Sequence, residues 1–159
     1  MKKIQKKKVR SAGFTLIEIL VVVGIIAVLA AVVLVAVNPA RQFKLARDSQ
    51  RVSNVTAILS AVGQNLAEHK GVLVCGGDTV ALPATSTRMK SGSAPGGFDL
   101  GPCIIPNYIS ALPFDPSLPG AFFTDDTSYD TGYMIHADSG GRVTLRAVGE
   151  INTPISVTR

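Results

Sequence analysis

Histidine and cysteine are scarce in this chain of 159 residues, which contains two of each. The histidines, His69 and His136, accompany no nucleophile motif and no spaced set of ligands, so we expect both to be structural. Two cysteines without a nearby histidine do not make a four-ligand zinc site. No phosphate-binding glycine loop is present, since Gly96-Gly97 and Gly140-Gly141 lack a following Lys-Ser or Lys-Thr. The sequence therefore predicts no catalytic residue, no cofactor, no metal and no enzymatic activity.

Acidic residues are absent from the first 13 positions, which are strongly basic. Six of the sixteen Lys and Arg residues lie there: Lys2, Lys3, Lys6, Lys7, Lys8 and Arg10. The ten basic and eleven acidic residues from Phe14 onward give that part a formal charge of −1. A domain that binds nucleic acid through bulk positive charge keeps this charge in its folded part. Nucleic acid as a partner therefore has no support here, although a local basic patch stays open.

Polar side chains are missing over nineteen residues, from Ile19 to Val37. At about 1.5 Å per residue, a helix over this run crosses most of a bilayer core of roughly 30 Å. A secretory signal has a shorter apolar core that precedes its cleavage site, so we expect a membrane helix instead. Basic residues beside such a helix stay in the cytoplasm, and the six basic residues before it outnumber the four that follow. This balance predicts a cytoplasmic N-terminus.

One carboxylate, Glu18, lies at the start of this apolar run. An acid inside an apolar helix costs about 2.5 to 3.5 kcal/mol on insertion scales, so Glu18 needs a partner. If the chain is cut between Gly13 and Phe14, the new amine of Phe14 lies one helical turn from Glu18. The carboxylate of one copy then neutralises the amine of the next. An uncleaved single-pass anchor is the alternative, but it has no need for this acid.

The run Gly13-Phe14-Thr15-Leu16-Ile17-Glu18, between a basic leader and a continuous apolar helix, resembles the prepilin signature of type IV pilins and type II secretion pseudopilins. The resemblance implies that residues 1–13 are a leader, which a prepilin peptidase cleaves after Gly13 before it methylates the amine of Phe14. It also implies that Glu18 and Phe14 act in filament assembly and that residues 14–37 form a transmembrane and filament-core helix.

The function that this resemblance implies is a structural subunit of a type IV pilus, a helical surface filament that serves adhesion, twitching motility or DNA uptake. Its expected partners are copies of itself, the prepilin peptidase, membrane lipid, and an inner-membrane assembly platform with its ATPase. The subunit is expected in the membrane first and in an extracellular filament later. Two alternatives stay open: a type II secretion pseudopilin, and a minor or competence pilin that binds DNA or a surface at the filament tip.

Beyond Asn38-Pro39, where we expect a kink, apolar residues recur at helical spacing. They form the stripe Leu45, Val52, Val55, Ile58, Leu59, Val62 and Leu66, which Lys70-Gly71 ends. Residues 38–70 are therefore the amphipathic half of the same helix. Asp48 falls within the stripe, and two interpretations stay open for it. Asp48 and its neighbours Arg47 and Arg51 form either a solvated pair within the helix or charge pairs between subunits.

The remaining chain divides into a loop-rich region and a sheet. Residues 71–131 are rich in Gly, Ser and Pro and form the loop and connecting region, in which 72–74 and 79–82 pair as small strands. Residues 132–159 form a C-terminal antiparallel sheet, with a hairpin around 138–141 and an edge strand interrupted by Pro154. Its predicted core face is Tyr133, Ile135, Val143, Leu145 and Ala147. The fold class is α+β: a long kinked N-terminal helix packed on about three to four antiparallel strands, with a pilin-like ladle shape.

Cys75 and Cys103 both fall in the exported part, where an even count favours a disulfide over two free thiols. The bridge closes a loop of about 29 residues, worth about 3 to 4 kcal/mol in the chain-entropy model. The segment Leu112–Pro116 resembles a Pro-Asp-Pro loop of pilins and pseudopilins, a neighbourhood that binds calcium in some pseudopilins. The candidate calcium ligands are Asp115, Asp125, Asp126 and Asp130, with ordinary turn-forming aspartates as the alternative.

Overall fold

A computed structural model describes residues 13–92 and 96–159 of the chain. The chain divides into two compact units between Ala40 and Arg41, and each unit is described by itself. Most of the predicted leader, residues 1–12, and residues 93–95 of the predicted loop lie outside the described residues.

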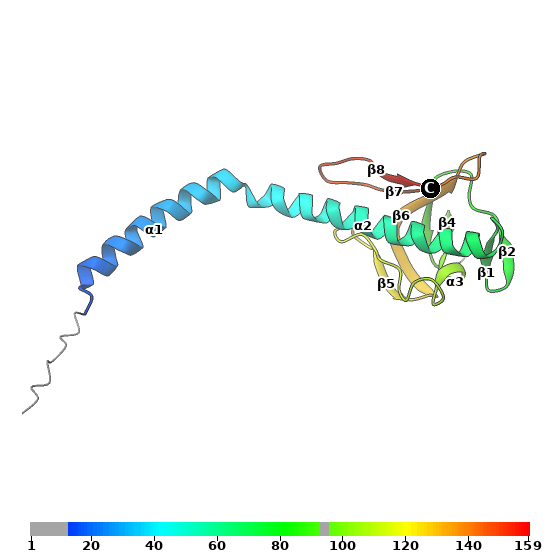
Figure 1. Ribbon diagram of the computed structural model, residues 1–159, viewed down its shortest axis with the longest axis horizontal. Coiled ribbons are helices and arrows are strands. Elements are labelled where there is room, and N and C mark those ends of the chain that lie inside the picture. The colour runs from blue at the N-terminus through cyan, green and yellow to red at the C-terminus, as the bar shows by residue number, and fades with distance from the viewer. Residues whose placement is uncertain (1–12, 93–95) are drawn as a thin grey trace, which may run out of the picture. The chain divides into compact units, whose positions relative to one another are not determined.

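Helix α1, Leu16–Val37, dominates the first unit and is drawn in blue in Figure 1. Its side chains are almost all aliphatic, and none of its residues is buried. With a mean hydropathy of 3.4 over its most apolar window, α1 is long and apolar enough to cross a membrane. The predicted apolar helix is therefore confirmed.

Asn38 alone separates α1 from α2, which spans Pro39–Glu68. The φ angle of Asn38 is 45°, in the left-handed region that ends helices and that asparagine tolerates. Pro39 then begins α2, where a residue without an N–H leaves no helical hydrogen bond unmade. The predicted interruption at Asn38-Pro39 is confirmed.

The end of α2 also follows the prediction. Lys70 and Gly71 have φ angles of 56° and 90°, and the Gly71 N–H donates to the Leu66 carbonyl at 2.7 Å. This reversal satisfies a carbonyl of the last helical turn. Glycine fits this position because it adopts a positive φ without steric cost.

The buried face of α2 differs from the predicted stripe in its first half. Val55, Ile58, Leu59 and Val62 are buried as predicted. Val52, however, is 45% exposed, while the charged residues Asp48 and Arg51 are 1% and 2% exposed. In its first half the helix therefore buries two charged side chains, Asp48 and Arg51, whereas the apolar periodicity predicted burial of Leu45 and Val52.

The sheet is larger than predicted. The short strands β1 (Leu73–Cys75) and β2 (Asp78–Val80) form the expected hairpin. The main sheet of the described residues has six strands in the order β4-β3-β6-β7-β8, with β5 also paired to β6. Its strands are β3 (Thr87–Lys90), β4 (Gly97–Phe98), β5 (Phe122–Asp125), β6 (Ser128–Ala137), β7 (Val143–Ala147) and β8 (Ile155–Thr158).

Three of these strands come from the region predicted as loop, so the sheet is not confined to residues 132–159. The β3–β4 pair is parallel and the other pairs are antiparallel, which makes the sheet mixed. The long strand β6 recruits β3 along one part and β5 along another. The predicted edge strand is β8, which starts directly after Pro154 and pairs only with β7.

The core lies between α2 and the sheet in the second unit, where Figure 1 shows α2 running along one face of the strands. The whole predicted strand face is buried: Tyr133, Ile135, Val143, Leu145 and Ala147. It joins one cluster with Val55, Ile58 and Val62 of α2 and with the short helix α3 (Gly101–Ile104). The α+β class is thus confirmed.

Candidate functional site

The first candidate site is the start of α1, where a capping box fixes the local geometry. Thr15 is the N-cap residue, and its hydroxyl accepts from the Glu18 N–H at 3.2 Å. In return the Glu18 carboxylate accepts from the Thr15 N–H at 3.4 Å. The carboxylate therefore lies in the first helical turn, where the helix dipole favours negative charge.

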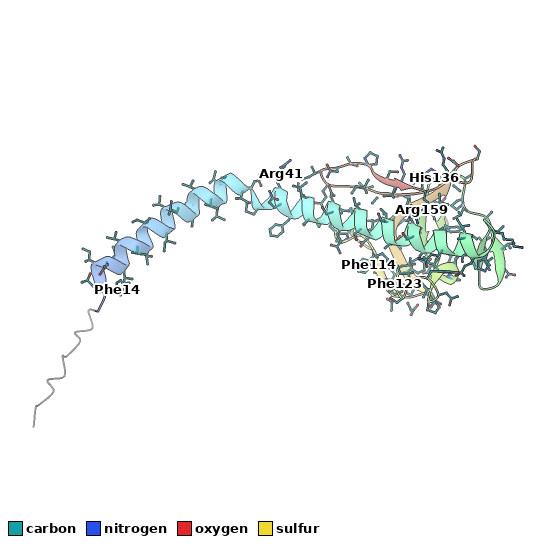
Figure 2. The ribbon with its side chains drawn as sticks, viewed as in Figure 1. Phe14, Arg41, Phe114, Phe123, His136 and Arg159 are labelled. Atoms are coloured by element: carbon teal, nitrogen blue, oxygen red, sulfur yellow. A yellow bond between two sulfur atoms is a disulfide. The ribbon has the colours of Figure 1, made fainter. Side chains whose placement is uncertain are left out.

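The predicted cleavage bond lies just before this box. Gly13 and Phe14 are both exposed and precede the helix in non-helical backbone, and Figure 2 labels Phe14 at the start of α1. A Cβ atom placed on Gly13 would have no neighbour within 4 Å. The bond between these residues is thus open to a peptidase, and the helix that follows would remain whole after the cut.

Glu18 is the one charged residue of α1, and the helix exposes every apolar side chain around it. No other described residue of the first unit covers this surface. Burial of apolar surface from water is favourable by about 25 cal/mol per Å², so a helix of this composition is stable only with lipid or other apolar helices around it. This helix therefore needs an apolar partner from outside the first unit.

The second candidate site is a buried ion cluster, defined here as Arg47, Asp48, Arg51, Asp115 and Glu150. Its centre is the guanidinium of Arg51. The Nε and Nη2 groups of Arg51 donate to the two carboxylate oxygens of Asp115 at 2.7 and 2.8 Å. The Nη1 group donates to Asp48 at 2.8 Å and to Glu150 at 3.2 Å. With a further bond from Nη2 to Ser117, all five N–H donors of Arg51 have acceptors.

Asp48 ties α2 to the loop between β7 and β8. Its carboxylate accepts from the backbone N–H groups of residues 150, 151 and 152 at 2.8 to 2.9 Å. Burial raises the pKa of Asp48, but these N–H groups and Arg51 together lower it by a larger amount. The pKa of Asp48 therefore lies well below its usual range. The same balance, with burial opposed by Arg51 and by the N–H groups of Ser117 and Leu118, lowers the pKa of Asp115.

The rim of the ion cluster is the pair between Arg47 and Glu150, which is partly exposed. Two bonds of 2.6 Å join the guanidinium to the carboxylate in a bidentate arrangement. The Arg47 guanidinium is the main cause that lowers the pKa of Glu150 to about 2. Both carboxylate oxygens of Glu150 are therefore engaged within the chain.

The structure corrects one of the two interpretations of the charges on α2, the solvated pair within the helix. Asp48 and Arg51 are not a solvated helical pair, because both are almost fully buried. Asp48, Arg51 and Arg47 all bind partners within one chain, and charge pairing between subunits stays a prediction. The sequence did not identify Asp115 and Glu150 as those partners, which lie 64 and 99 residues from Arg51. The one signal was the position of Asp48 within an apolar stripe, with Arg51 three residues after it.

Cys75 and Cys103 form the disulfide that the sequence predicted. Buried Asn65 of α2 lies beside it, a residue that the sequence analysis did not single out. The Asn65 amide donates to the carbonyls of Val74 and Cys103 at 2.7 Å and accepts from the Val74 N–H at 3.0 Å. Asn65 thus holds both segments of the bridge against α2.

The candidate calcium ligands do not converge. Asp115 binds Arg51, Asp130 binds Arg88 at 2.6 Å, and Asp125 caps its own turn through Thr127. Among residues 13–92 and 96–159, no three His, Cys, Asp or Glu side chains group as a metal site. The two histidines lie apart: His69 Nδ1 contacts the Asn65 carbonyl at 2.8 Å, while His136 lies in β6.

Comparison with known proteins gives one match. Residues 8–34 fit the family model of the prokaryotic N-terminal methylation motif. The match covers the end of the basic segment, the capping box and most of α1, and does not extend into the second unit. No curated protein and no solved structure matches the chain significantly.

Proposed function

We propose that this chain, which carries the prepilin-type leader of type IV pilins and pseudopilins, is a structural subunit of a type IV pilus. The motif supports processing by a prepilin peptidase, and in the proposal the chain is a substrate of that enzyme and has no catalytic activity of its own. In the proposal the cut follows Gly13, the amine of Phe14 is methylated, and α1 anchors the subunit in the membrane with its N-terminus in the cytoplasm. An assembly platform and its ATPase then move the subunit into an extracellular filament.

The observation that carries the proposal is the combination of this motif with an apolar helix that the described residues of its own unit leave uncovered. In a filament core, copies of α1 supply that cover to one another through close packing. Glu18 is the one charge in this surface, and the cleaved amine of a neighbouring copy is a cation that would neutralise it. The Thr15 capping box supports this role because it keeps the carboxylate at the end of the helix.

Mass spectrometry of sheared surface material tests the processing step. We expect the mature chain to begin at methylated Phe14 and to occur in long fibres visible by electron microscopy. A chain that still begins at Met1 contradicts the proposal. Short fibres confined to the envelope indicate a pseudopilin, and salt-sensitive DNA binding by a low-abundance component indicates a tip pilin.

Replacement of Glu18 tests the assembly step. We expect Glu18→Ala to insert into membranes like the wild type but to form few or no filaments, since the pairing with the Phe14 amine is lost. Asp78→Ala is the control, because it removes an exposed carboxylate from the β1–β2 hairpin. Normal filaments from Glu18→Ala would remove Glu18 from the assembly mechanism.

A further inference from the structure

A groove of about 530 Å³ lies beside the first half of α2 in the second unit. Its lining consists of Gln50 and Asn54 from α2, residues 111–114 and Pro116 from the loop between α3 and β5, and Phe123 from β5. Figure 2 labels Phe114 and Phe123, whose side chains lie on the same side of α2. None of the lining residues is charged. A groove of this volume accommodates several aliphatic side chains.

Hydrogen bonds and an ion pair within the single chain fix the wall of the groove at Phe114. The Asn54 amide donates to the Phe114 carbonyl at 3.1 Å and to the Tyr133 hydroxyl at 2.9 Å. The next residue, Asp115, is fixed by its two bonds to Arg51. The ion cluster therefore positions the wall of the groove, so that a partner need not order it on binding.

The apolar surface extends beyond the groove along α2. Phe114 is 41% exposed, and Phe43 is 65% exposed. Phe43 lies seven residues before Gln50 and eleven before Asn54, a spacing that places all three on one face of the helix. Phe43 therefore adds an exposed apolar side chain to the helix face that borders the groove, and exposed apolar side chains that gather on one face are a feature of interaction sites.

The chemistry of this surface restricts what binds it. A charged partner would lose water without gaining an opposite charge, because the groove offers none. The chain contains a segment that fits: α1 has no charged residue after Glu18 and exposes apolar side chains on all its faces. An apolar helix in an apolar groove is an established mode of recognition, with anchors at successive helical turns.

We propose that the groove at Phe114 and Phe123 binds α1 of a second copy of this chain. The inference rests on the proposed function, since filament assembly is the process that brings the α1 helices of other copies beside the second unit. It goes further by naming the surface of the second unit that receives the helix. Each subunit then contributes an apolar helix and a groove that accepts one.

Photo-crosslinking in assembled filaments tests the contact directly. Benzoylphenylalanine replaces Phe114 in full-length protein, and filaments are formed from a mixture of isotope-labelled and unlabelled chains. We expect crosslinks between residue 114 of one copy and a peptide from residues 19–37 of another. Crosslinks within one copy, to the second unit of a neighbour, or to a different protein would overturn the proposal. So would the absence of any crosslink from assembled filaments.

A pair of phenylalanine variants provides the functional test. Phe122 is the matched control, because it is 44% exposed and adjacent to Phe123 but does not line the groove. We expect Phe114→Ser to lower the amount of sheared filament by about tenfold, as expected for an aromatic anchor of an interface. Phe122→Ser should leave the amount unchanged. Equal filament amounts from the two variants would overturn the inference.

The two proposals fail in different ways. If wild-type chains form filaments while position 114 crosslinks elsewhere, the groove inference is wrong and the pilin function stands. If wild-type chains keep their leader and form no filaments, the pilin function is wrong and the groove inference falls with it.

Discussion

Replacement of Arg51 by alanine is expected to destabilise the second unit severely. Arg51 is 2% exposed, and the Arg51→Ala variant removes all five of its hydrogen bonds at once. The carboxylates of Asp48 and Asp115 would remain, at 1% and 5% exposure, without their cation. Removal of one partner from a buried ion pair costs about 3 to 5 kcal/mol, because the other charge stays buried and unpaired.

The expected loss is a large share of the free energy of unfolding of a domain, which is about 5 to 15 kcal/mol. Urea unfolding of the full chain in detergent micelles measures it. Near-ultraviolet circular dichroism of the buried residues Tyr129 and Tyr133 reports on the second unit, while α1 stays helical in the micelle. We expect the unfolding midpoint of Arg51→Ala to fall sharply at pH 7.

Arg142→Ala is the matched control, since Arg142 also binds an aspartate, Asp138, but is 72% exposed. Exposed pairs contribute little, so its midpoint should stay near that of the wild type. The double variant Arg51→Ala with Asp115→Ala should regain part of the loss, because the unpaired carboxylate is removed. Equal midpoints for Arg51→Ala and Arg142→Ala would refute the assignment of a buried ion cluster.

Two further predictions concern pH and Asn65. The pKa values of Asp48, Asp115 and Glu150 are lowered in the folded chain. The unfolded chain therefore binds more protons, and stability falls below about pH 5. A wild-type urea midpoint that does not drop between pH 7 and pH 4 would contradict this prediction. Asn65→Leu should lower the free energy of unfolding by about 2 to 4 kcal/mol, because it leaves buried backbone groups of Val74 and Cys103 unpaired. Gln64→Leu is the control, since Gln64 is exposed. Equal urea midpoints for the two variants would contradict this prediction.

The elements that the sequence predicted well are those whose periodicity reports burial directly. The stripe from Val55 to Val62 and the alternation from Tyr133 to Ala147 each follow the period of their element. The strands that it missed lack this signal. The strand β3, Thr-Arg-Met-Lys, buries only Met89, and β4 has two residues. Their strand geometry depends on pairing with distant β6, which no local pattern encodes.

The ion cluster could not be predicted either, because its contacts also join residues that are far apart in the sequence. The helical spacing placed Asp48 within the apolar stripe, with Arg51 three residues after it. Charged side chains on a buried face require buried partners. The partners of Arg51 come from loops far along the chain, at Asp115 and Glu150. From the sequence alone, any other carboxylate was an equally good candidate for this pairing. Periodicity thus locates a buried charge, whereas only the fold identifies what neutralises it.

The same comparison separates the carboxylates of the two units. The Asp48 carboxylate accepts hydrogen bonds from three backbone N–H groups and one guanidinium of its own chain. Its charge is therefore neutralised in the folded monomer. Glu18 has neutral partners from Thr15, three residues away, and lies on a helix with no buried residue. A carboxylate with only weak neutral donors in an apolar surface still gains from a cation. Of these two carboxylates, Asp48 is therefore neutralised within one copy, and Glu18 is the one that still gains from a cation outside its own helix.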